Sequence, residues 1–195
     1  MHGCIEDIEN DVRVLFAFTD KAHDFSHTKR VLETSIMLQK QIDTDEEIVQ
    51  IIALLHDVDD KKLFSAKNGE ANARYLLNKH GYPDAMQKQI LSGIHEISFS
   101  GGCIGSTEEA KIVQDADRLD AIGAIGIART FTYGGSKSIP IYDANGNCII
   151  DHFYDKLLKL ETLMNFDISR EMAKKRTACM RCFLEQFFAE LSNNT

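Results

Sequence analysis

The chain has 195 residues, of which 44% are hydrophobic and 27% are charged, and only two of them are prolines. This is the composition of a mostly helical globular protein that is long enough for one well-buried core. The net charge of -8 argues against a nucleic-acid polymer as partner, because attraction to the phosphate backbone depends on clustered lysine and arginine. No apolar run approaches the roughly 20 residues that cross a bilayer, so no membrane partner is expected. An acidic N-terminus and five scattered cysteines indicate a cytoplasmic protein.

Apolar residues recur at helical spacing along almost the whole chain. In chain order, this pattern predicts helices over about residues 12–18, 26–42, 44–55, 68–80, 85–97, 107–128, 151–166 and 169–191. Thr44 followed by Glu47 predicts a capping box at the start of the third helix. Residues 133–147 lack helical spacing and contain the tight-turn signal Asn145-Gly146. We therefore expect a substrate-facing flap over about residues 133–150, which could form a short hairpin.

The pair His56-Asp57 follows the apolar residues 51–55 at the end of the third predicted helix. An imidazole and a carboxylate in such a place cost free energy to desolvate unless a metal or a charge partner satisfies them. His27 upstream and Asp117 downstream complete the order H…HD…D. Taken singly, each residue could be an ordinary buried histidine or a turn-capping aspartate, but the set favours a metal site. Two imidazoles and two carboxylates suit one divalent ion, with Mn²⁺ first, Fe²⁺, Co²⁺, Ni²⁺ or Zn²⁺ as alternatives, and Mg²⁺ less natural.

The segments that carry these residues, 23–31, 53–62 and 115–121, strongly resemble the HD superfamily of metal-dependent phosphohydrolases. Residues 97–99, 123–131, 133–135 and 152–157 resemble the small single-domain bacterial branch of that superfamily, so the resemblance covers nearly the whole chain. It implies an all-α fold, a single HD-domain helical bundle over residues 1–195. The metal-binding core would span about 20–130, the flap 133–150 and the closing helices about 151–193. The resemblance also implies that the metal is held by His27, His56, Asp57 and Asp117.

The resemblance implies cleavage of phosphoester or phosphoanhydride bonds. Some members of this branch resemble nucleoside triphosphate pyrophosphohydrolases, so the expected reaction converts a nucleoside triphosphate to the monophosphate and pyrophosphate. Two alternatives stay open: a 5'-nucleotidase that acts on monophosphates, and a ligand sensor that keeps the fold without turnover. The identity of the base and the sugar is open, and so is the oligomeric state, monomer or homodimer.

A general base is needed to take a proton from water activated by the metal. If the helix that carries the HD pair continues for one more turn, Asp60 would lie on the ligand face, four residues after His56. Asp59 is the rival for this role. The pattern of the resembled branch places an acid and a lysine at Asp60 and Lys62, which favours Asp60 as the catalytic acid-base group.

Phosphate groups need cations as well as the metal, and the candidates are Lys62, Arg129 and Lys137. His95 is a further candidate for contact with the substrate. His23 lies outside the predicted second helix, so it would shape a turn or touch phosphate rather than bind the metal. We expect one metal ion, because the sequence around His95 does not resemble the second-metal motifs of the superfamily.

Two further features leave alternatives open. Asp120, three residues after Asp117, could orient a ligand or pair with Arg118. Gly123 and Gly126 interrupt a predicted helix at a cost of roughly 1 kcal/mol each relative to alanine. They therefore indicate either close packing or close approach to a ligand.

Overall fold

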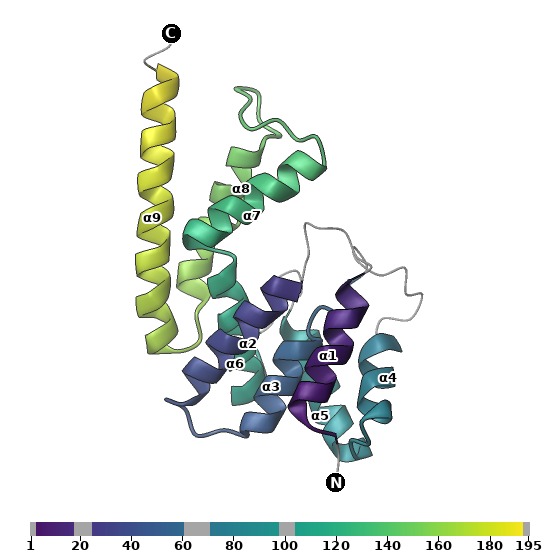
Figure 1. The fold of residues 1–195 in the computed structure, drawn as a ribbon. Coiled ribbons are helices and arrows are strands. Elements are labelled where there is room, and N and C mark those ends of the chain that lie inside the picture. Colours follow the sequence, from purple (N-terminus) through teal and green to yellow (C-terminus); the bar gives the residue numbers. More distant parts are fainter. Residues whose placement is uncertain (1–2, 18–24, 61–70, 98–103, 193–195) are drawn as a thin grey trace. The chain divides into compact units, whose positions relative to one another are not determined.

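Figure 1 shows the chain as a computed structural model, which describes residues 3–17, 25–60, 71–97 and 104–192. Within these ranges all regular elements are helices and no strand occurs, so the expected all-α fold class is confirmed. None of these helices is both long enough and apolar enough to cross a bilayer. The elements are α1 (Ile5–Phe16), α2 (Phe25–Gln39), α3 (Glu46–Leu55), α4 (Ala71–Lys79), α5 (Asp84–Ile97), α6 (Glu108–Asp120), α7 (Gly123–Ser136), α8 (Ile149–Asp155), the 3₁₀ helix η2 (Leu157–Leu163) and α9 (Asp167–Ser192).

The chain divides into two compact units, Met1–Asp117 and Arg118–Thr195, and helix α6 contributes residues to both. Each unit contains fully buried apolar side chains, such as Leu54 in the first unit and Phe153 in the second. The expectation of one domain over residues 1–195 stays a prediction.

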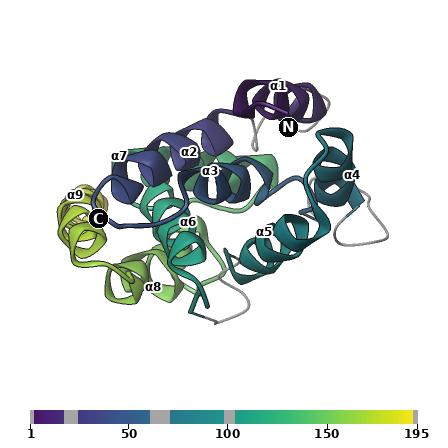
Figure 2. The same cartoon turned by 90° about the horizontal axis from the view of Figure 1, so that it is seen from below.

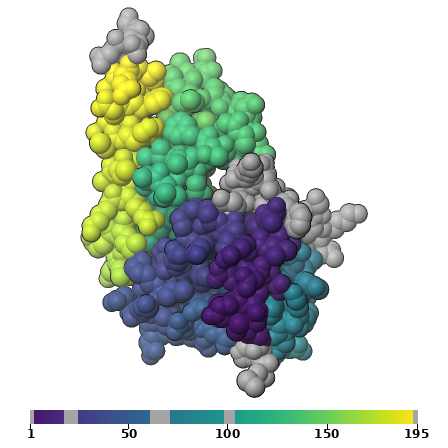
Figure 3. All heavy atoms as spheres, viewed as in Figure 1, coloured from purple at the N-terminus to yellow at the C-terminus, as the bar shows by residue number. Residues whose placement is uncertain are grey.

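Helix α3 is the centre of the first unit. It packs against α1, α2 and α5, and Figure 2 shows it among these three helices. In the view of Figure 3, α1 (purple) lies at the surface of the unit. Seven of the ten residues of α3 are buried, which is the pattern of a helix that is apolar on all sides and lies inside the protein. The residues that follow the end of α3, His56 and Asp57, are therefore partly buried.

Asp45, not Thr44, caps the N-terminus of α3. One oxygen of the Asp45 side chain, Oδ1, accepts hydrogen bonds from the backbone N–H groups of Glu47 (3.0 Å) and Ile48 (3.2 Å). The predicted capping box on Thr44 is therefore wrong by one residue, since a helix start has one N-cap and aspartate is at least as good a cap as threonine. The Thr44 hydroxyl instead lies 3.5 Å from the carbonyl oxygen of Ile42.

In the second unit, α7 packs against α9 and α8, and η2 packs against both α8 and α9. An aromatic cluster joins three of these helices: the ring of Phe153 on α8 stacks on Phe183 of α9 at 5.9 Å between centroids and lies 6.0 Å from Phe131 of α7. Phe153 is fully buried. The predicted closing helix over about 151–166 is interrupted at Lys156 and forms two elements, α8 and η2.

The predicted flap is shorter than the sequence suggests, and it forms no hairpin. Residues 133–136 belong to α7, and no strand occurs in residues 137–148. Gly134 is closely packed inside this helix, since a Cβ added to it would lie 2.3 Å from Cδ1 of Ile149. The turn signal is correct, since the N–H of Gly146 donates to the carbonyl of Asp143 at 3.1 Å and Gly146 has a φ of 86°.

The single helix predicted over about 107–128 is instead two helices, because the helix ends at Asp120 and a new one, α7, begins at Gly123. Gly123 starts α7 with a φ of +81°, a conformation that other residues rarely adopt. A Cβ added to Gly126 would lie 2.3 Å from the carbonyl oxygen of Ala121. Close packing of the backbone, one of the two alternatives left by the sequence, therefore accounts for Gly126, whereas the positive φ accounts for Gly123.

Candidate metal centre

His56 and Asp57 lie at the point where the buried helix α3 ends. His56 is the C-cap residue of α3, and its Nδ1 atom lies 2.8 Å from the carbonyl oxygen of Ala53. Because a carbonyl oxygen only accepts, Nδ1 must carry the hydrogen. In the neutral imidazole, Nε2 is then an unprotonated nitrogen whose lone pair is available to a cation.

His27 lies in the first turn of α2, and its ring contacts Nε2 of His56. The two Nε2 atoms of His27 and His56 are 3.2 Å apart, and the planes of the two rings are 72° to each other. Oδ2 of Asp57 lies 3.4 Å from both Nε2 atoms. The ligand atoms of these three residues all lie within 4.8 Å of one another, so they could hold a metal ion.

Asp117 of α6 reaches the same group, with its Oδ1 3.4 Å from Nε2 of His27. The two histidine side chains are buried, at 8% exposed for His27 and 2% for His56, whereas 25% of Asp57 and 30% of Asp117 is exposed. The first unit thus brings all four predicted ligands together from three helices. The carboxylate side of the cluster is the one open to solvent.

Within the cluster, the imidazoles and the carboxylates stabilise each other's charged forms. Burial opposes the charged form of His56, but the adjacent Asp57 carboxylate outweighs burial, so the pKa of His56 is raised. Burial also opposes ionisation of Asp57, but the imidazoles of His56 and His27 hold its pKa well below the usual range. The pKa of Asp117 is lowered against burial, chiefly by the hydrogen bond to His27. Without an ion, the carboxylates therefore favour proton uptake by a buried imidazole.

The raised pKa of His56 predicts a pH trend in the metal-free protein that is opposite to the pH trend of metal binding. The raised pKa of His56 stabilises the metal-free protein below about pH 6.5, and this contribution is lost as the pH rises through the raised pKa. The lowered pKa values of Asp57 and Asp117 stabilise it above about pH 4, and that contribution is lost as the pH falls through the lowered values. Mn²⁺ needs the unprotonated imidazole, so it should raise the melting temperature more at about pH 7.5 than at about pH 6.

Differential scanning calorimetry at the two pH values, with and without Mn²⁺, measures this difference. An increase in melting temperature that is the same at both pH values would contradict competition between protons and metal at His56.

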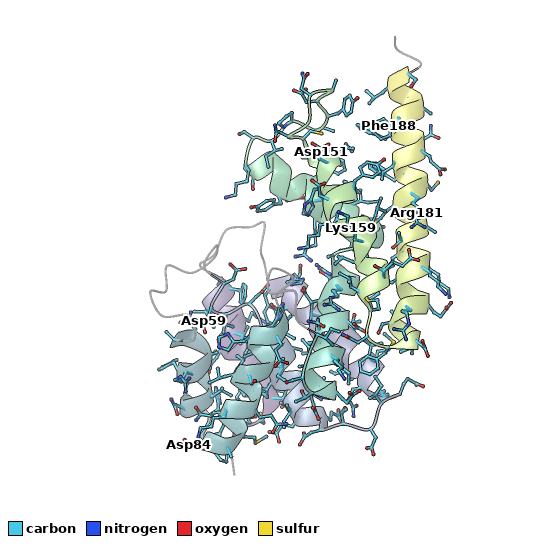
Figure 4. All side chains as sticks on the ribbon, turned by 180° about the vertical axis from the view of Figure 1, so that it is seen from behind. Asp59, Asp84, Asp151, Lys159, Arg181 and Phe188 are labelled. Carbon is cyan, nitrogen blue, oxygen red and sulfur yellow. The ribbon has the colours of Figure 1, made fainter. Side chains whose placement is uncertain are left out.

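Asp59, the rival for the role of general base, is used elsewhere. Its Oδ1 accepts the backbone N–H of Asn72 and its Oδ2 that of Ala73, both at 2.9 Å, and Figure 4 shows Asp59 beside the start of α4. The helix α3 does not continue for one more turn, because residues 56–59 form a turn in which the N–H of Asp60 donates to the carbonyl of Asp57 at 3.1 Å. That premise for Asp60 is wrong, and its catalytic role stays a prediction.

The remaining predicted residues are spread over the chain. Lys62 and His23 lie outside the described residues. His95 is exposed in the last turn of α5. In the second unit, Arg129 forms an ion pair with Asp120, and the exposed Lys137 lies 5.8 Å from the centre of the Tyr133 ring.

Comparison with known proteins places this cluster in a family. The family model of the HD domain matches residues 24–122, which include the four clustered residues, so the chain belongs to the HD-domain family. It is an HD-family hydrolase, and the resemblance seen in the sequence is confirmed.

Two relatives are similar over almost their whole length. YpgQ of Bacillus subtilis is 34% identical over 186 residues, which cover 93% of this chain and 90% of YpgQ. A solved HD-superfamily hydrolase from Bacillus thuringiensis is 37% identical, with a TM-score of 0.80 and 96% of both chains covered. The structure of YpgQ in complex with ADP is 30% identical, with a TM-score of 0.83 and 95% and 94% of the two chains covered.

Proposed function

We propose that this protein is a divalent-metal-dependent phosphohydrolase that acts on nucleotides, and that it hydrolyses nucleoside triphosphates to the monophosphate and pyrophosphate. The observation that carries the proposal is the convergence of His27, His56, Asp57 and Asp117 in the first unit. The ADP bound by the relative YpgQ supports a nucleotide as the class of ligand.

The ligand atoms of His27, His56 and Asp57 fit one ion in spacing as well as in chemistry, and Oδ1 of Asp117 adds an oxygen 3.4 Å from Nε2 of His27. Two ligand atoms at right angles, each about 2.1–2.3 Å from an ion, are about 3 Å apart. The separations between neighbouring ligand atoms in the structure are 3.2 and 3.4 Å. Two nitrogen and two oxygen ligands favour Mn²⁺ first among the divalent ions, with Fe²⁺, Co²⁺, Ni²⁺, Zn²⁺ or Mg²⁺ as alternatives.

When bound, the ion supplies positive charge that stabilises the phosphoryl group and makes water more acidic. We assign proton acceptance to Asp60, because both carboxylate oxygens of Asp59 accept backbone hydrogen bonds. Lys62, Arg129 and Lys137 are the proposed cations for the phosphate groups. The guanidinium of Arg129 is held by Asp120 and is 30% exposed, so it is both oriented and accessible.

His95 and His23 are the proposed further contacts with the substrate. A cytoplasmic location and a monomeric or homodimeric state also stay predictions.

Phosphorus NMR of the reaction products tests the proposal. The Mn²⁺-loaded protein is incubated with a panel of nucleoside triphosphates and monophosphates, and the manganese is chelated before each spectrum is recorded. We expect monophosphate and pyrophosphate from a triphosphate, and no product from the Asp57→Ala variant. Orthophosphate from monophosphates would identify a 5'-nucleotidase instead. Absence of turnover with every metal would favour the ligand sensor.

A further inference from the structure

The start of helix α4 is bonded to the turn that carries the proposed metal ligands. The side-chain Nδ2 of Asn72 donates to the carbonyl oxygen of Val58 at 2.7 Å. The backbone N–H groups of Asn72 and Ala73 donate to the two carboxylate oxygens of Asp59, both at 2.9 Å. We propose that Asp59 and Asn72, here named the α4 clamp, are positioning residues that hold Asp57 in place for metal binding. This inference rests on the proposed function of the cluster.

The α4 clamp holds the chain just after Asp57, and the hydrogen bond of the His56 ring holds it just before Asp57. On the near side, the ring of His56 is bonded to the carbonyl of Ala53 at 2.8 Å. On the far side, Val58 is fully buried, so its carbonyl must find a partner inside the protein, and Asn72 provides that partner. Asp57 is thus held from both sides, although it lies beyond the last residue of α3.

Asp59 is suited to this role by its charge. The N-terminus of a helix has unpaired N–H groups and a partial positive charge, and a carboxylate satisfies both. Asp59 supplies this carboxylate from 13 residues earlier in the chain, so it ties α4 to the turn rather than capping a helix of its own. Asp57 and Asp59 therefore have different partners: Asp57 faces the two imidazoles, and Asp59 accepts hydrogen bonds from the start of α4.

The expected effect follows from the role of residues that support metal ligands. Loss of such a residue typically weakens metal binding by about 10-fold to 100-fold. Asn72→Ala removes the bond to Val58 but leaves the backbone N–H of residue 72, and it touches no proposed ligand. We expect its affinity for Mn²⁺ to fall by about 10-fold to 100-fold.

Gln87→Ala is the matched control. The Gln87 side chain is likewise an amide, and it donates to Oδ1 of Asn78 at 2.9 Å and to the carbonyl of Tyr82 at 2.8 Å. These bonds lie at the other end of α4 and do not involve residues 56–59. Both variants should lower the melting temperature of the metal-free protein, but only Asn72→Ala should weaken Mn²⁺ binding.

Isothermal titration calorimetry with Mn²⁺ decides between the outcomes, at a temperature where circular dichroism shows each protein folded. Equal weakening in both variants, or equal affinity of Asn72→Ala and wild type, would overturn the α4 clamp alone. A wild-type protein that binds no Mn²⁺ would overturn the proposed function and with it this inference.

Two substitutions of Asp59 keep the test informative if Asn72→Ala does not fold. Asparagine caps a helix about as well as aspartate, and the single Oδ1 of Asp45 shows that one oxygen can accept two backbone N–H groups. Asp59→Asn should therefore bind Mn²⁺ more tightly than Asp59→Ala, and it should recover turnover at saturating Mn²⁺ relative to Asp59→Ala. Wild-type affinity with equally lost turnover in both variants would show that Asp59 is the proton acceptor, which would overturn its assignment as a positioning residue.

Discussion

His27→Ala is expected to bind Mn²⁺ at least about 100-fold more weakly than the wild type, because loss of a supporting residue alone costs about 10-fold to 100-fold and His27 is a proposed ligand. Nε2 of His27 lies 3.2 Å from Nε2 of His56 and 3.4 Å from both Oδ2 of Asp57 and Oδ1 of Asp117, so His27 contacts every other member of the cluster. At 100 times the dissociation constant, a ligand stabilises a protein by about 2.7 kcal/mol. At an Mn²⁺ concentration 100 times the wild-type dissociation constant, the wild type should gain stability of this order. The variant should gain almost none at the same concentration, because it binds Mn²⁺ more weakly.

Calorimetric titration gives the affinity, and melting with and without Mn²⁺ gives the gain in stability. His152→Ala is the matched control, since it removes an imidazole from an exposed position on α8. It should bind Mn²⁺ as the wild type does. If His27→Ala kept the wild-type affinity, His27 would be an ordinary buried histidine and the proposed metal centre would be wrong.

The members of the cluster could be predicted from sequence because their order and the buried run before them were visible there. The apolar residues of α3 end at Leu55, and an imidazole and a carboxylate directly after them need compensation, which His27 and Asp117 provide in the structure. The use of Asp59 could not be predicted in this way. Its partner Asn72 is 13 residues away and belongs to no motif, so only the three-dimensional path of the chain reveals the bond.

The fold class follows from helical spacing, but the ends of helices depend on competition between neighbours. Thr44 and Asp45 are adjacent and both can cap, and the chain uses Asp45. Near residues 133–136, the glycines and the lack of helical spacing predicted a flap, but contact with Ile149 makes Gly134 favourable inside α7. Contact across 15 residues of chain cannot be inferred from local composition. Prediction therefore succeeded where burial repeats along one helix, and it failed where adjacent residues compete for a cap or where a distant residue decides.

Phe153→Ala is expected to reduce the free energy of unfolding by about 3–5 kcal/mol. The Phe153 ring is fully buried in the second unit and lies between Phe131 of α7 and Phe183 of α9. Its removal loses the transfer free energy of a large apolar side chain and leaves a cavity between helices that can close only in part. Urea unfolding followed by circular dichroism measures the loss as a lower midpoint.

Tyr154→Ala is the control for Phe153→Ala, because it removes an aromatic ring from the next position of the same helix, where 48% of the residue is exposed. Substitution at such a surface position usually changes stability by no more than about 0.5 kcal/mol. Both variants lose a ring and gain alanine, which favours helix formation equally, so the difference between them reports burial rather than helix propensity. A loss below about 1 kcal/mol for Phe153→Ala would mean that α7, α8 and α9 do not share an aromatic core, since full burial of such a ring is worth more than that.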